Sequence, residues 1–249
     1  MIKLLRADFA RLFSSRLFSL CVYAMLVPAI LAVCMLAAAD KQGGHYSPSD
    51  NMLFAGATYI GIVIAVLIGF FIGTDYSGGA VRNKLYVGHS KAEVYFSNLI
   101  TCTSASLIMH IIWLVVVISA ETVGIIRKFE TPAGKIMSEV FVSIFAVSAM
   151  AAVFNLICML IPSRSKGSVS AVVLSFIMLS VTDAFEGTPL YDVIPTCQII
   201  QLTNTVPPSP WGYYMEIPEN INMFPFYSLL IIVIATAVGV CIFSRKDLK

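Results

Sequence analysis

Long uninterrupted apolar runs constrain this chain more than any other feature. Four runs carry no Asp, Glu, Lys or Arg, namely 18–39, 53–73, 99–120 and 140–161. A bilayer core about 30 Å thick needs about 20 helical residues to cross it, and the backbone must satisfy its own polar groups there. Because the runs are continuous and do not alternate with polar residues, they predict helices and not barrel strands. Two further spans are predicted at 168–185 and 226–243.

Composition leads to the same conclusion. Hydrophobic residues make up 58% of the 249 residues and charged residues 12%, against about 45–50% and 25% in soluble domains. The mean hydropathy is +0.87. These values exclude a soluble globular domain, a disordered chain, a nucleic-acid-binding protein and a disulfide-stapled secreted domain. Five of the six cysteines lie inside predicted spans, without metal-binding or redox spacing. The sequence therefore predicts an all-α polytopic membrane protein forming one permease domain over 1–249.

Basic residues predict the orientation. Six spans place both termini on one side, and that side holds 12 of the 16 Lys and Arg residues, in segments 1–17, 74–98, 162–167 and 244–249. Because excess Lys and Arg mark cytoplasmic loops, both termini are predicted to be cytoplasmic.

The segment 1–17 is amphipathic. At 100° per residue, a stripe about 100° wide collects the apolar residues Ile2, Leu5, Phe9, Leu12 and Phe13. Lys3, Asp8 and Arg11 lie away from this stripe. The pattern predicts a helix lying along the membrane surface before the first span.

The region 75–95, between the second and third spans, is the most informative. Gly78-Gly79 and Gly88 bound a short predicted helix over 80–87. Val81 and Leu85 share one face of it, which predicts an exposed apolar ridge. Ser90 and Glu93 have the spacing of a capping box, so a second helix is predicted to begin there. A compact helical knob is thus expected to project into the cytoplasm.

Several kinds of chemistry have no motif in this sequence. There is no G-x-x-x-x-G-K-[ST] loop for nucleotide phosphates, no H-E-x-x-H and no G-x-S-x-G. The three histidines fall in three separate regions. Asp183, near the outer end of the fifth span, is the one acidic residue within a predicted span. An intramembrane enzyme or an ion-coupled carrier therefore has few candidate residues.

Two segments resemble a known family. The stretch from Asp75 to Tyr95 (DYSGGAVRNKLYVGHSKAEVY) is similar to the acidic-Tyr-Ser-x-Gly-x-x-Arg-x-Lys-Leu…Gly-x-[Ser/basic]-Arg-x-Glu-x-Tyr segment of bacterial type 2 ATP-binding-cassette permeases. Lys91 stands where many relatives have arginine. Segment 1–17 is similar to the elbow helix of these permeases, and six spans with both termini inside also fit them.

The resemblance implies a partner and a site. In that family the helix after the second span is a coupling helix, which docks on a separate cytosolic ATPase subunit that binds ATP and Mg. Two permease copies and two ATPases form an exporter in the bacterial cell membrane. The coupling residues that the resemblance implies are Ala80, Val81, Arg82, Lys84, Leu85, Tyr86, Val87, Gly88 and His89.

The cargo is a further expectation. The small permeases that this chain resembles imply export of an amphipathic, antimicrobial or cytolytic peptide. A drug or lipid-like substrate of the same machinery is an alternative, and so is an ion-coupled secondary transporter, which belongs to a different class. The resemblance favours a homodimer of permease chains, and a heterodimer of two different permeases stays open.

Other polar and small residues have two interpretations each. Ala65, Gly69 and Gly73 form a small-residue run that suits a dimer interface or close packing within one subunit. His110 and Asn155 lie in mid-span, where they would line a pathway or form interhelical hydrogen bonds. The Pro-rich segment 186–225, with a short helix predicted over 196–205, is expected to be an extracellular cap, serving as a gate or stabilising the last two spans.

Overall fold

A computed structural model describes residues 1–41, 49–126, 128–129, 131–161, 163–185, 188–203 and 221–246. Over these residues the regular structure is helical, without strands. The helices are α1 (Ile2–Phe13), α2 (Arg16–Lys41), α3 (Ser49–Ala55), α4 (Ala57–Ser77), α5 (Ala80–Tyr86), α6 (Lys91–Thr122), α7 (Ala133–Leu160), α8 (Arg164–Phe185), α9 (Pro189–Val193), α10 (Pro195–Thr203) and α11 (Phe224–Arg245), with a 3₁₀ turn at Ile221–Met223.

Six helical segments of the described chain are long and apolar enough to cross a membrane. They are Arg16–Ala38, Met52–Ser77, Lys91–Thr122, Ala133–Leu160, Arg164–Thr182 and Ile221–Arg245. The six predicted spans fall within or nearly within these segments, although the second is divided at Gly56 between α3 and α4. The all-α, multi-pass membrane architecture is therefore confirmed.

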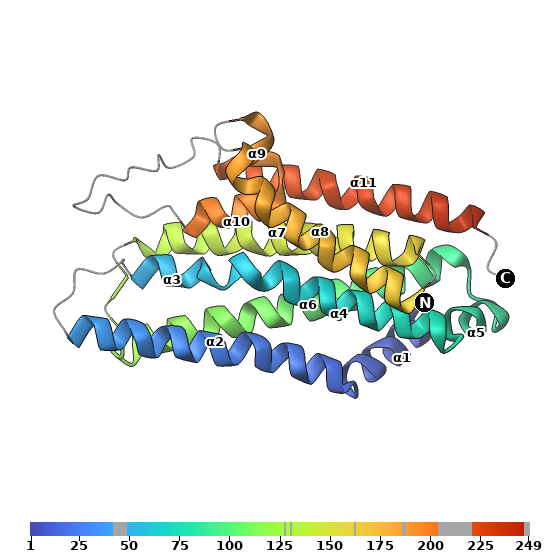
Figure 1. The fold of residues 1–249 in the computed structure, drawn as a ribbon, viewed down its shortest axis with the longest axis horizontal. Helices are drawn as coiled ribbons and strands as arrows, with labels where there is room; N and C mark the ends of the chain where they lie inside the picture. The colour runs from blue at the N-terminus through green and yellow to red at the C-terminus, as the bar shows by residue number, and fades with distance from the viewer. Residues whose placement is uncertain are drawn as a thin grey trace.

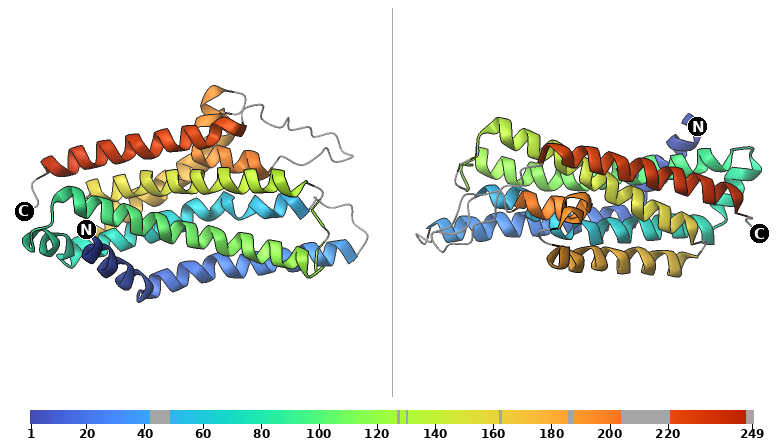
Figure 2. Two further views of the ribbon diagram at one scale, coloured as in Figure 1. Left: turned by 180° about the vertical axis from the view of Figure 1, so that it is seen from behind. Right: turned by 90° about the horizontal axis from the view of Figure 1, so that it is seen from above.

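The spans form an elongated bundle, with α1 set at an angle to α2 (Figure 1). The N-terminus and the end of α11 lie at the end that carries α5, and the end of α2 and the start of α7 lie at the opposite end (Figures 1 and 2). The turn at Ser14 and Ser15 separates α1 from α2, and the Ser15 hydroxyl donates to Leu12 O at 2.7 Å. Most of the basic residues thus flank one end of the bundle, which we call the α5 end.

Small residues allow the helices to approach closely. A Cβ on Gly69 would lie 2.7 Å from Ser168 Cα, and one on Gly73 would lie 2.9 Å from Arg164 Cα. Helix α8 therefore covers the small-residue run of α4 within this chain, as one of its two interpretations predicts. On α11, a Cβ at Gly239 would overlap the Tyr95 hydroxyl of α6.

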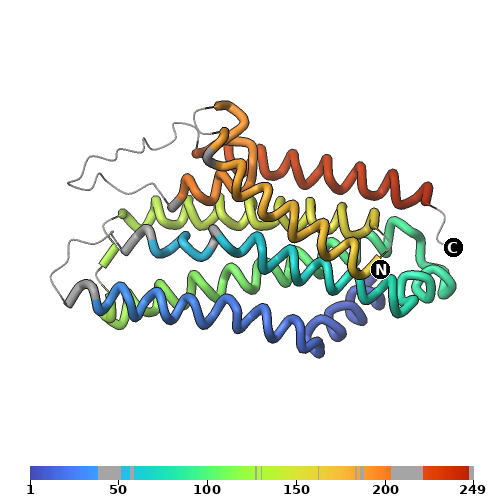
Figure 3. Tube along the Cα trace, viewed as in Figure 1, coloured from blue at the N-terminus to red at the C-terminus, as the bar shows by residue number. Residues whose placement is uncertain are grey.

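The chain turns back after α8. Figure 3 traces it through α9 and along α10 before it reaches α11. Cys197 and Ile199 of α10 are fully buried, and α10 packs against α3, α4 and α7. The predicted short helix over 196–205 is present as far as Thr203, and residues 204–220 lie outside the described residues. Within the expected cap, α10 therefore packs among the spans, whereas α9 has no buried residues.

Candidate functional site

Glycines and a capping box set the position of α5. Helix α4 ends at Ser77, and Gly79 then takes a φ of 70°, a left-handed conformation that favours glycine. Gly88 follows α5 with a φ of 99°. Ser90 Oγ accepts from the Glu93 amide at 3.2 Å, while Glu93 Oε2 accepts from the Ser90 amide at 3.0 Å. This capping box begins α6 as predicted, and the two turns hold α5 at the end of the bundle.

The exposed face of α5 is not the one that the sequence pattern predicted. Val81 is 1% exposed and belongs to the core, and Leu85 is half-buried against it. The expectation of an exposed Val81–Leu85 ridge is wrong, because this face packs onto the spans of the same chain. The exposed residues are instead Arg82 and Asn83, together with Tyr86 at 87% and, directly after the helix, Val87 at 80%.

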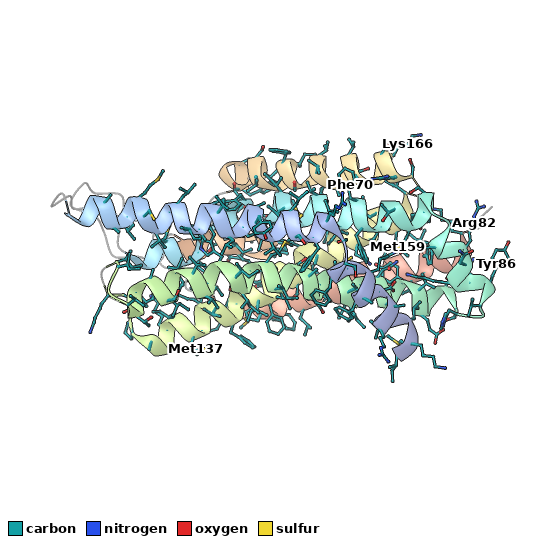
Figure 4. All side chains as sticks on the ribbon, turned by 90° about the horizontal axis from the view of Figure 1, so that it is seen from below. Phe70, Arg82, Tyr86, Met137, Met159 and Lys166 are labelled. Atoms are coloured by element: carbon teal, nitrogen blue, oxygen red, sulfur yellow. The ribbon has the colours of Figure 1, made fainter. Side chains whose placement is uncertain are left out.

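A groove lies beside this exposed face. It has a volume of about 300 Å³ and is lined by Arg82, Leu85, Tyr86 and Lys91. In Figure 4 the labelled Arg82 and Tyr86 project from the end of the bundle, and Lys166 lies on a separate helix at the same end. Ala80 is half-buried and Gly88 exposed. His89 Nδ1 lies 3.4 Å from Glu93 Oε2, so it contacts α6 and not the groove.

Behind α5, four charged side chains form a compact group that we call the charge cluster: Asp8, Arg11, Asp75 and Lys84. Lys84 Nζ lies 2.7 Å from Asp8 Oδ1 and 3.2 Å from Asp75 Oδ2. Arg11 pairs with Asp75 and lies 3.8 Å from Asp8. The two carboxylates are almost fully buried, at 2% and 0% exposed. Formal charges balance, as burial requires.

The charge cluster joins four helices. Asp8 and Arg11 come from α1, Asp75 from α4 and Lys84 from α5, while Ser97 of α6 donates to Asp8 Oδ2 at 2.7 Å. The Arg11 guanidinium also stacks 4.0 Å from the centroid of the Phe71 ring. Through these contacts α1, α4, α5 and α6 are fixed to one another at the α5 end.

Burial has the largest effect on the pKa of both cations, Lys84 and Arg11. It lowers the pKa of the Lys84 ammonium below its usual value, and the hydrogen bond and charge of Asp8 oppose that change. Burial likewise lowers the pKa of Arg11, against the charge of Asp8. The adjacent carboxylate of Asp8 thus favours the charged form of both cations against desolvation. Lys84, expected among the coupling residues, is an internal ion-pair partner and not a surface contact.

Helix α1 turns a largely apolar face inward that carries one acidic residue, Asp8. Leu4, Asp8 and Leu12 are buried, whereas Ile2 and Phe13 are exposed. A helix is present over Ile2–Phe13 as predicted, but Asp8 faces the bundle and not water, and the position of the helix on a membrane surface stays a prediction. Apolar residues of the predicted stripe remain on the outside of the subunit, where a membrane surface would cover them.

Helix ends at the α5 end are also capped by side chains. Lys91 Nζ donates to Ser244 O at 2.9 Å and to Lys246 O at 2.8 Å. Lys246 Nζ donates to Leu160 O at 2.5 Å, and the Tyr76 hydroxyl donates to Met159 O at 2.6 Å. Carbonyl groups that lack partners at the ends of α7 and α11 are satisfied in this way.

The mid-span polar candidates do not join the α5 end. Ser143 Oγ donates to Val140 O, so it accepts from His110 Nε2 at 2.8 Å, which links α6 to α7. Asn155 is fully buried on α7, and Ala65 is fully buried on α4. No cluster of His, Cys, Asp or Glu suited to a metal ion occurs among the described residues.

No protein-family model and no curated protein matches this chain.

Sequence reasoning missed the charge cluster, although two signals were present. Asp8 and Asp75 are the acidic residues closest to the first and second spans at this end, in segments that otherwise carry basic residues. Acidic residues placed among apolar neighbours beside a span favour burial with a basic partner.

Proposed function

We propose that this chain is the permease subunit of an ATP-driven exporter, a type 2 ATP-binding-cassette permease. It would work with a second permease copy and two cytosolic ATPase subunits, which bind ATP and Mg. The α5 end would then face the cytoplasm of a bacterial cell, consistent with its basic residues.

The observation that carries the proposal is the exposed tip of α5. Tyr86 and Val87 are more than three-quarters exposed at an end of the bundle where polar and basic residues gather. Apolar side chains so placed, beyond the lipid-facing length of the spans, gain stability when a protein partner covers them. Glycine turns on both sides hold this tip in one position, as a docking element requires.

The charge cluster supplies a connection from α5 to the spans. A partner that moves α5 would also move Lys84, which holds Asp8 of α1 and Asp75 of α4. Because breaking these buried pairs is costly, α5 and the ends of these helices would move together. Closure of the ATPase pair upon ATP binding would thus reach α4 and α1.

The proposed cargo is an amphipathic peptide, with a drug or lipid-like molecule as the alternative. The scarcity of charge within the spans favours such a cargo over a hydrophilic ion.

The experiment is co-purification of the chain with its ATPase, together with ATP hydrolysis in nanodiscs. Tyr86→Asp combined with Val87→Asp should abolish association, or should remove stimulation of ATP hydrolysis by the cargo. Val123→Asp is the matched control, since Val123 is 75% exposed at the opposite end. Normal association and stimulated hydrolysis in the Tyr86/Val87 variant would contradict the proposal.

An ion-coupled carrier is the alternative from a different class. Such a carrier needs acidic or basic groups free to exchange an ion, whereas both carboxylates of the charge cluster are paired with Lys84 or Arg11. Transport by the purified chain in proteoliposomes, driven by a proton or sodium gradient without any ATPase, would favour the carrier.

A further inference from the structure

We propose that the groove lined by Arg82, Leu85, Tyr86 and Lys91 binds an acidic side chain, Asp or Glu, of the ATPase subunit. This inference rests on the proposed function and adds the chemistry of the contact. An apolar tip alone does not determine how the ATPase subunit is oriented on α5. A carboxylate of the ATPase bound between two cations would fix both the orientation and the position of that subunit on α5.

The two cations of the groove are differently placed. Arg82 is exposed and makes no ion pair or hydrogen bond with the described part of the chain. Its guanidinium can therefore form a bidentate pair with a carboxylate. Lys91 uses two of its three ammonium protons on the carbonyls of Ser244 and Lys246. This attachment to α11 holds the ammonium at the wall of the groove and leaves one proton for an incoming acceptor.

No acidic residue lines the groove. Glu93 is the acidic residue closest to the groove in the sequence, and its carboxylate already has two partners. It accepts a hydrogen bond from the Ser90 amide and lies 3.6 Å from the amino group of Met1. The positive charge of the groove is thus not neutralised by the residues that line it. Leu85 and Tyr86 supply the apolar part, which suits the methylene groups of a carboxylate side chain.

Placement favours a protein over a lipid headgroup. Arg82 and Tyr86 project from the end of the bundle (Figure 4), on a helix that lies beyond the end of α4. A headgroup phosphate would be expected beside the lipid-facing sides of the spans, at the level where the spans end. Tyr86 and Val87, adjacent to Arg82, point to a partner that covers this end of the bundle from the aqueous phase.

The test measures affinity between the purified permease in nanodiscs and its ATPase, with Arg82→Glu as the variant. Lys166→Glu makes the same charge change on an exposed cation of α8 at the same end, away from the groove. Arg82→Glu should raise the Kd at least about tenfold at 0.1 M salt, and the difference should shrink near 1 M salt, where screening reduces the Debye length to about 3 Å. Lys166→Glu should change the Kd less than about twofold.

A second step identifies the acid. Each Asp or Glu on the ATPase surface is changed to Lys, and one such change should restore binding to Arg82→Glu while weakening binding to the unchanged permease. Equal affinity for Arg82→Glu and the unchanged permease would overturn the groove inference, even if Tyr86 and Val87 variants still lose the ATPase. Loss of binding to phosphatidylglycerol vesicles by Arg82→Glu, with ATPase affinity intact, would assign the groove to lipid and would also overturn it.

Discussion

Removal of Asp75 should be among the most damaging single substitutions at the α5 end. Asp75 is fully buried and is the partner of both Arg11 and Lys84. In Asp75→Leu these two cations share Asp8 alone, so one buried positive charge has no counterpart. Loss of one member of a buried ion pair costs about 3–5 kcal/mol. For a chain of this size that cost corresponds to a decrease in Tm of about 6–20 °C.

A double-mutant cycle separates the loss of this ion pair from a general packing defect. Arg11→Met alone leaves Asp75 with Lys84 and an excess negative charge, at a cost near the lower end of the range because Arg11 is 34% exposed. The double variant, Arg11→Met with Asp75→Leu, removes a complete pair and leaves Lys84 with Asp8 at 2.7 Å. Its stability should recover to within about 2 kcal/mol of the unchanged protein.

The assay is equilibrium unfolding in mixed micelles with increasing SDS, followed by tryptophan fluorescence. Arg6→Met serves as the control, because Arg6 is an exposed cation on the same helix and has no ion pair with the described residues. Additive losses in the double variant, or a loss below about 1 kcal/mol for Asp75→Leu alone, would refute the charge cluster as a buried, mutually dependent network.

Three further predictions concern packing and topology. Val81→Asp should destabilise the chain by about 3 kcal/mol or more in the same unfolding assay, because it buries a carboxylate, whereas Val87→Asp should change stability by less than about 0.5 kcal/mol. Gly239→Ala should cost about 1–3 kcal/mol and shift the fluorescence-detected Tm downward, because its Cβ overlaps the hydroxyl of Tyr95. In a cysteine-free background, a membrane-impermeant maleimide added to intact cells should label Val123→Cys and not Val87→Cys; the reverse pattern would contradict a cytoplasmic α5 end.

The sequence predicted the spans well because their determinants are local. A run of about 20 apolar residues is sufficient to define a membrane helix, since the bilayer sets its length and the backbone bonds are internal. The same holds for the capping box at Ser90, whose two hydrogen bonds join residues three positions apart. The start of α7 was less exact, because the helix begins at Ala133, seven residues before the predicted apolar run at 140.

The faces of the short helices could not be predicted in this way, because distant residues determine them. Lys84 and Asp8 are 76 positions apart, and Ser97 and Asp8 are 89 apart. A helical wheel sorts residues by polarity and assumes that polar residues face water. That assumption fails where a residue of opposite charge lies inside the bundle, and for this reason Asp8 and Lys84 face inward. The position of Asp8 and Asp75 beside the spans favours burial with a basic partner, but the sequence alone does not identify which basic residue it is.

The two sides of α5 therefore have different roles, whereas the sequence pattern had assigned both roles to the Val81–Leu85 ridge. On the inner side of α5, Val81 and Lys84 pack against the spans, so their substitution should be detected first as a loss of folding stability. On the outer side, Arg82, Tyr86 and Val87 make no contribution to the core, so their substitution should leave the fold intact and alter what binds there. A coupling element needs both sides, since a partner can move the spans only through a helix that is itself held firmly to them. Variants of α5 should therefore fall into two groups, and the division should follow burial instead of hydrophobicity.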